Sequence, residues 1–194
     1  IVKNLDSTTS WLVQHSSIGP TKALYLETFG AETDNATFWN DTAPTTTTVS
    51  IGTHSDGNAS GDDIIAYCFR NVAGFSKFGS YTGNSSDNGP IVETGFEVGY
   101  LMIKNASDAG SWFIYDNKRS TTNPRKEYLI ANGGNVEASD MGGVDFLSNG
   151  FQIKEDHDDV NDTGDTYIYL AFATDPDTQA PTLADSFSVE TYTG

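Results

Sequence analysis

Short runs of β-branched and aromatic residues alternate with polar turn residues along the whole chain. Such alternation is typical of half-buried strands, and pairs such as Gly19-Pro20, Asp56-Gly57 and Asn149-Gly150 are typical of the turns between them. No long window holds a helical period. The pattern predicts an all-β chain of antiparallel β-sandwiches, of the jelly-roll or lectin-like type. The expected strands cover residues 11–13, 23–26, 47–51, 64–69, 99–103, 112–115, 127–131, 150–153 and 167–172.

The sequence of the first half recurs in the second half at a nearly constant spacing. The matched segments are Ile1–Asn4 with Met102–Asn105, Trp11 with Trp112 (112 − 11 = 101), Tyr25-Leu26 with Tyr128-Leu129, and 61–69 with 164–172 (164 − 61 = 103). Because the matches preserve the alternation, we expect both halves to fold alike. Trp11 and Trp112 are then expected to be buried at equivalent places in the two cores.

The repeat continues beyond the second copy, because Phe75 and Tyr81 return as Phe187 and Tyr192. The predicted domains are a first β-sandwich that lacks its N-terminal strands (1–73), a second β-sandwich (74–176), and a linker with the first strand of a further repeat (177–194). A repeat of about 100 residues is the size of a small domain. The chain is therefore interpreted as part of a longer tandem array, and such arrays often build extended appendages.

The chain is strongly acidic, with 27 Asp and Glu against 10 Lys and Arg and a formal net charge of −17. An anionic surface repels nucleic acid and anionic membranes, so we expect no nucleic-acid partner. No apolar stretch approaches the ~20 residues of a membrane span, so we expect no membrane insertion. Like charges keep a protein dispersed, which suits display outside a particle or cell. The single cysteine, Cys68, is expected to pack in a strand core.

An acid-rich hairpin precedes the last expected strand. Its candidate metal ligands are Asp156, Asp158, Asp159, Asp162 and Asp165. Several converging carboxylates are the ligands that calcium prefers, so calcium is the one cofactor that the sequence suggests. The spacing is not that of an EF-hand, and the matching segment 53–63 holds fewer acids. The alternative is an exposed, solvated hairpin tip without a metal.

Segment 38–44 has no counterpart in the second copy, and it contains Trp39 followed by Asn40 and Asp41. An aromatic ring can stack on the apolar face of a sugar while amide and carboxylate groups bind its hydroxyls. Trp39, Asn40 and Asp41 are therefore the candidate glycan-binding residues. The alternative is that Trp39 anchors its loop by packing.

Catalytic signatures are missing from the sequence. His15, His54 and His157 lie in polar, turn-like segments, and only His157 has carboxylates directly on both sides of it. There is no G-x-S-x-G nucleophile elbow, no H-E-x-x-H and no Gly-rich phosphate loop. We therefore expect a protein that is not an enzyme.

Several motifs together resemble a known family. They are the run from Gly74 to Asn84, the turns 88–90 and 94–96, Met102–Asn105 with Trp112, and segment 38–44. They resemble a domain of unknown function found in tail-fibre and other virion appendage proteins of marine and cyanobacterial phages. The resemblance implies a lectin-like β-sandwich of the concanavalin A type on the outside of a virion, and it carries no catalytic signature.

The resemblance and the repeat lead to one expectation about function. The chain is expected to be a virion surface or tail-fibre structural protein that adheres to a host-surface glycan. Its partners would then be neighbouring copies, other virion proteins and that glycan, and its location would be the virion surface or the extracellular space. The alternatives are a structural fibre or capsid-decoration subunit without a ligand, a cellular adhesin or filament subunit, and a polysaccharide depolymerase.

Overall fold

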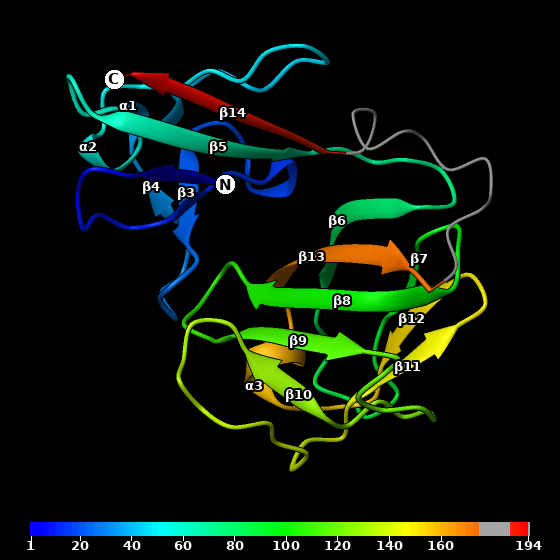
Figure 1. Cartoon of the computed structure of the whole chain (residues 1–194). Helices are drawn as coiled ribbons and strands as arrows, with labels where there is room; N and C mark the ends of the chain where they lie inside the picture. The colour runs from blue at the N-terminus through cyan, green and yellow to red at the C-terminus, as the bar shows by residue number, and fades with distance from the viewer. Residues whose placement is uncertain (175–186, 194) are drawn as a thin grey trace.

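The chain folds mostly into β-strands that form antiparallel sheets (Figure 1). The computed structural model describes residues 1–174 and 187–193. These residues form three sheets joined by loops and short helical turns, which confirms the all-β prediction. No helix among them is long and apolar enough to span a bilayer. The predicted linker at 177–186 lies outside the described residues.

The six-stranded sheet contains strands from both ends of the chain, at the top of Figure 1. Its spatial order is β14 (Phe187–Thr193), β5 (Asp63–Phe69), β1 (Val2–Asn4), β2 (Leu12–Val13), β3 (Lys22–Tyr25) and β4 (Thr33–Asp34). Strand β14 pairs with β5 along its whole length, from Phe187 opposite Phe69 to Thr193 opposite Asp63. The last described strand thus closes an edge of a sheet that the first 69 residues otherwise build.

The second half of the chain forms the other two sheets. The five-stranded sheet has the order β10 (Tyr128–Ile130), β9 (Trp112–Asp116), β8 (Val98–Asn105), β13 (Thr166–Ala173) and β6 (Ser76–Thr82). The three-stranded sheet has the order β11 (Val144–Leu147), β12 (Gly150–Ile153) and β7 (Ile91–Glu93). The helical turns are η1 (Ser16–Ile18), α1 (Ala36–Trp39), α2 (Ser55–Asn58) and α3 (Asp158–Asn161).

Three apolar clusters hold these layers together. Leu101 and Tyr169 of the five-stranded sheet pack with Phe151 of the three-stranded sheet in the largest cluster. The outer face of the six-stranded sheet is covered by Phe38 and Trp39 of α1. The inner faces of the six- and five-stranded sheets meet in the third cluster, which contains Val13, Ile18, Leu24, Ala106, Trp112 and Ile168. Each sheet therefore buries at least one face.

One expected strand is not formed. Residues 47–51 are a loop, although threonine and valine favour strands. The backbone N–H of Thr45 donates to the backbone oxygen of Thr48 at 2.8 Å, and their hydroxyls are 2.7 Å apart. Local side-chain hydrogen bonds of this kind compete with strand pairing, so the prediction for 47–51 was wrong.

The structure aligns β3 of the first half with β10 of the second half differently from the sequence match. Leu12 pairs with Tyr25, whereas Phe113, which stands at the place of Leu12, pairs with Ile130. The structural counterpart of Tyr25 is therefore Ile130 (130 − 25 = 105) rather than Tyr128. A shift of two residues keeps each side chain on the same face of the sheet, so the alternation hides the insertion from the sequence.

The matched tryptophans do not anchor the cores of their own halves. Trp112 is 1% exposed and packs on the six-stranded sheet, where its indole N–H donates to the backbone oxygen of Tyr25 at 3.1 Å. Trp11 is only half-buried, with its ring stacked at 6.4 Å on Tyr67. Trp11 directly precedes Leu12, which pairs with Val2. Trp112 directly precedes Phe113, which pairs with the matched residue Ile103. The two rings therefore hold equivalent strand positions, but the prediction that each is buried in the core of its own half was wrong.

Candidate functional site

Asn105, at the end of β8, holds the hairpin that contains α3. Its side-chain nitrogen donates to Oδ2 of Asp165 at 2.8 Å and to the hydroxyl of Tyr167 at 3.3 Å. Its side-chain oxygen accepts from the backbone N–H groups of Ser107 and Asp108. Because Asn105 is 1% exposed, these groups depend on one another for their hydrogen bonds. We call Asn105 and these partners the asparagine brace.

The same brace is present at Asn4, in β1. Its side-chain nitrogen donates to Oδ2 of Asp62 at 2.7 Å, and its oxygen accepts from the N–H groups of Asp6 and Ser7. Asn4 is also 1% exposed. The partners are the residues that the sequence match assigns to Asp165, Ser107 and Asp108. The tyrosine of the brace is the one member without a counterpart, because Ile64 occupies that place.

Edge strands β6 and β14 are tied to the two hairpins by matched tyrosines. The hydroxyl of Tyr81, in β6, donates to the backbone oxygen of Val160 at 2.6 Å. The hydroxyl of Tyr192, in β14, donates to the backbone oxygen of Gly57. Gly57 and Val160 occupy matched places in α2 and α3 (160 − 57 = 103). Strand β14 therefore occupies on the six-stranded sheet the place that β6 has on the five-stranded sheet.

Each histidine caps a short helical turn. Nδ1 of His15, His54 and His157 accepts from the backbone N–H two residues later, at 3.2, 3.3 and 3.2 Å. An accepting Nδ1 carries no proton, so the neutral ring carries its proton on Nε2. His54 and His157 hold matched positions, which adds to the likeness of the two hairpins.

The acid-rich hairpin does not bring its five predicted carboxylates to one point. Oδ1 of Asp162 accepts from the hydroxyl of Ser85, and Oδ2 of Asp165 accepts from Asn105 in the brace. Two more of its aspartates lie in the first turn of α3. Among the described residues, the predicted five-residue calcium site is therefore not formed.

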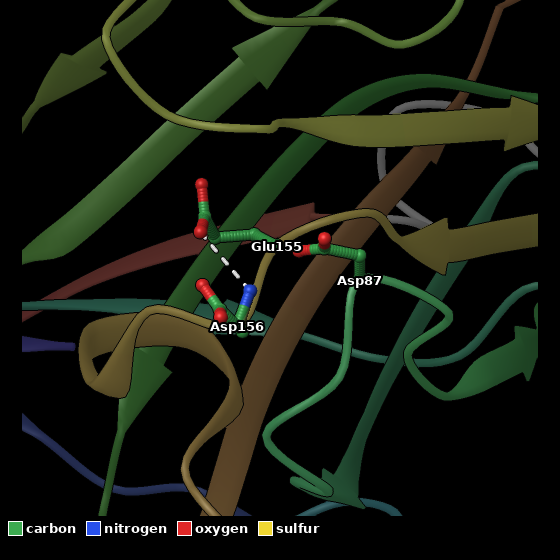
Figure 2. Close-up of side chains that lie close together, drawn as sticks. All are labelled: Asp87, Glu155 and Asp156. Carbon is green, nitrogen blue, oxygen red and sulfur yellow. Dashed lines mark hydrogen bonds between the residues drawn. The ribbon is translucent and has the colours of Figure 1, made fainter.

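A different carboxylate group forms around Asp156. One carboxylate oxygen each from Asp87, Glu155 and Asp156 lie within 4.8 Å of one another, with Asp87 on a loop that faces the hairpin (Figure 2). Glu155 is 8% exposed, and its Oε1 accepts from the N–H groups of Asp156 and His157 at 3.0 and 3.1 Å. Its Oε2 accepts from the N–H of Gly142. The buried residue Glu155 thus already has protein partners. The sequence analysis missed Asp87 because no local pattern connects it to the hairpin.

We expect calcium to bind weakly to this carboxylate group. Three carboxylates supply few of the six to eight oxygen ligands that calcium takes, and Glu155 is already hydrogen-bonded. Calorimetric titration should give a dissociation constant above about 10⁻³ M, and calcium near that concentration should leave the melting temperature unchanged. A constant below about 10⁻⁴ M that is lost in Asp87→Asn would contradict this expectation.

Trp39 lies in the core rather than on the surface. It is 1% exposed, and its indole N–H donates to the backbone oxygen of Lys22 at 2.9 Å. Asn40 and Asp41 are exposed and turn the chain after α1 with φ values of 53° and 48°, which Asn and Asp adopt more readily than most residues. The expected stacking platform for a sugar was therefore wrong, and Trp39 anchors its loop by packing.

A cavity of about 520 Å³ opens between the six- and five-stranded sheets and extends to Trp39, Pro44 and Val49. We call it the inter-sheet cavity. Ile1, Val13 and Tyr67 line it from the six-stranded side, and Met102 and Trp112 line it from the five-stranded side. None of the described residues that line it carries a side chain with a formal charge at neutral pH.

His15 lines the inter-sheet cavity with a buried, unsatisfied nitrogen. The residue is 6% exposed, and its Nε2 has no hydrogen-bond partner among the described residues. Burial lowers the pKa of His15 to about 4, and the nearby backbone of Tyr169 opposes this shift without reaching hydrogen-bond geometry. The sequence placed His15 in a polar turn, although its apolar neighbours Val13 and Ile18 are signs of burial.

We expect His15 to make the fold sensitive to acid. The unfolded chain binds a proton at His15 near pH 6.5, whereas the folded chain does so only near pH 4. The free energy of unfolding is therefore unaffected by His15 protonation above pH 6.5. It falls by about 3 kcal/mol through this residue as the pH drops toward 4. Urea unfolding at pH 7 and pH 4.5 should show a smaller difference for His15→Phe than for the unmodified chain. An equal difference in the free energy of unfolding between pH 7 and pH 4.5 in the two chains would contradict the role of His15.

Comparison with known proteins gives one match. The model of a family described as a domain of unknown function, DUF7483, matches residues 1–176. No curated protein and no solved structure matches the chain significantly. The matched range contains every described strand except β14. The family description states no activity, ligand or partner, so function must be argued from the residues of this chain.

Proposed function

This chain belongs to the DUF7483 family of domains of unknown function, and from that premise we propose that it is a structural module of an extended surface appendage, a phage tail fibre or virion decoration. In this proposal the chain consists of tandem β-sandwich repeats, with residues 1–73 and 74–176 as two of them. The module contributes length and stiffness to the appendage.

The asparagine brace is the observation that carries the proposal. Asn4 and Asn105 each hold a downstream aspartate and two consecutive backbone N–H groups, with each side chain almost fully buried. A buried network of this kind works only when every partner is in place, so its recurrence supports recurrence of the whole unit. Repeated units that join in series are suited to extended structures.

Closure of the sheet edges supports the recurrence of the unit. An open strand edge tends to pair with other chains, so proteins cover such edges. Strand β6 covers one side of β13, and β14 covers the matched side of β5 through the matched tyrosine. In an array, the first strand of each repeat would cover such an edge.

Packing between the sheets supports stiffness. Val13 and Leu24 of the six-stranded sheet are fully or almost fully buried against Trp112 and Ile168 of the five-stranded sheet. An apolar contact resists hinge motion more than a polar linker does. The proposal includes no sugar contact at Trp39, because that ring is buried. Among the functions considered, the structural fibre or decoration subunit without glycan adhesion is therefore the one we propose.

Labelling of intact particles tests this proposal. Antibodies against this chain should decorate an external appendage of purified particles from the source in electron micrographs. Antibodies against a protein known to lie inside the particle serve as the control and should label only after disruption. Label that appears only after disruption, or only in the soluble fraction of cells, would contradict the proposal.

A further inference from the structure

The inter-sheet cavity has no task in the proposed structural role, yet it has the size of a ligand site. Its volume of about 520 Å³ lies within the range of roughly 300–1,000 Å³ that is usual for small-molecule pockets. A pocket of this size beside two packed sheets is therefore a candidate ligand site.

His15 defines the polar contact that an occupant must make. Nδ1 accepts from the N–H of Ser17 at 3.2 Å, so the neutral ring carries its proton on Nε2. That N–H is a buried donor without a partner among the described residues, and an unsatisfied buried donor is costly. The missing partner is a hydrogen-bond acceptor, such as a carbonyl oxygen.

The remaining walls define the rest of the occupant. Aromatic rings gather around the cavity, from Tyr67, Phe78, Tyr100, Trp112 and Phe172. Such rings favour flat, apolar ligands that can stack or pack edge to face. A charged ligand would lose its hydration without gaining a charged partner from the described side chains.

We propose that the inter-sheet cavity binds an uncharged, largely apolar small molecule that presents an oxygen acceptor to Nε2 of His15. The molecule spans the gap between the two sheets and contacts both Tyr67 and Trp112. This site is independent of the structural role, because neither brace lines the cavity.

Two neutral fluorescent probes test the proposal on the whole chain. Nile red is flat and uncharged and carries a carbonyl oxygen, whereas N-phenyl-1-naphthylamine is similar in polarity but has no oxygen acceptor. Both should bind saturably, with blue-shifted emission and energy transfer from tryptophan. His15→Phe should weaken Nile red binding by roughly three- to tenfold, the effect of one hydrogen bond, and should leave the second probe unchanged.

A cavity-filling variant locates the binding. Leu170 and Met102 line the cavity from the five-stranded sheet, so Leu170→Trp should abolish binding of both probes, with Met102→Trp as the replacement if the first variant does not fold. Val136→Ala, at an exposed residue, is the matched control and should bind normally. Absence of saturable binding, binding that survives a folded cavity-filling variant, or equal effects of His15→Phe on both probes would each overturn the proposal.

Discussion

Replacing Trp112 with alanine is expected to lower the free energy of unfolding by about 3–5 kcal/mol, which is the usual cost of removing a buried tryptophan. Its ring is 1% exposed and fills the contact between the six- and five-stranded sheets. The substitution also leaves the backbone oxygen of Tyr25 without the indole N–H that donates to it. The loss therefore combines apolar area, packing and a hydrogen bond.

Thermal and urea unfolding measure this effect. The melting temperature should fall by about 6–20 °C, given 2–4 °C for each kcal/mol in a chain of this size. Trp11→Ala is the matched control, because Trp11 holds the equivalent sequence position but is only half-buried. Its cost should be about 1 kcal/mol. Equal losses in the two variants would contradict the different burial of the two rings.

Asn4→Ala and Asn105→Ala are each expected to destabilise the fold by about 2–4 kcal/mol. Either substitution removes the donor to a downstream aspartate and the acceptor for two consecutive backbone N–H groups. These groups lie around a side chain that is 1% exposed, so water replaces the lost partner poorly. The additional Tyr167 contact of Asn105 should make its loss the larger of the two.

Urea unfolding of both variants, with amide hydrogen exchange, checks this prediction. Asn135→Ala is the control, because Asn135 is exposed, and it should change stability by less than about 0.5 kcal/mol. Exchange should accelerate around α2 in the first variant and around α3 in the second. A large loss in one variant and none in the other would contradict equivalence of the two braces.

The strands were largely predictable because alternation is local. Residues 64–69 and 167–172 are rich in β-branched and aromatic residues, which favour strands, and β5 and β13 confirm both predictions. Short strands such as β4 and β7 escaped prediction because their pairing partners define them. The register of Tyr25 was also hidden, since an insertion of two residues leaves the alternation intact.

The candidate sites were less predictable because they depend on distant residues. Burial of Trp39 follows from its fit against the six-stranded sheet, including the backbone oxygen of Lys22, which no local pattern reveals. Asp87 joins Glu155 and Asp156 from a loop that lies far away in sequence. The cavity at His15 exists only where two sheets meet. Repetition was the one long-range signal in the sequence, and it matched Asn4 with Asn105 without revealing their hydrogen bonds.

Strand closure of the six-stranded sheet is tested most directly by supplying β14 as a separate peptide. A chain that ends at residue 174 lacks β14, which leaves β5 without the partner that covers its edge. Calorimetry should show one-to-one binding of a peptide of residues 187–193, and the peptide should raise the melting temperature of the shortened chain. A peptide with Tyr192→Ala should bind much more weakly, because Tyr192 packs on the apolar cluster under α1 and its hydroxyl donates to Gly57. No binding, together with a shortened chain as stable as the full one, would contradict closure of each repeat by an edge strand.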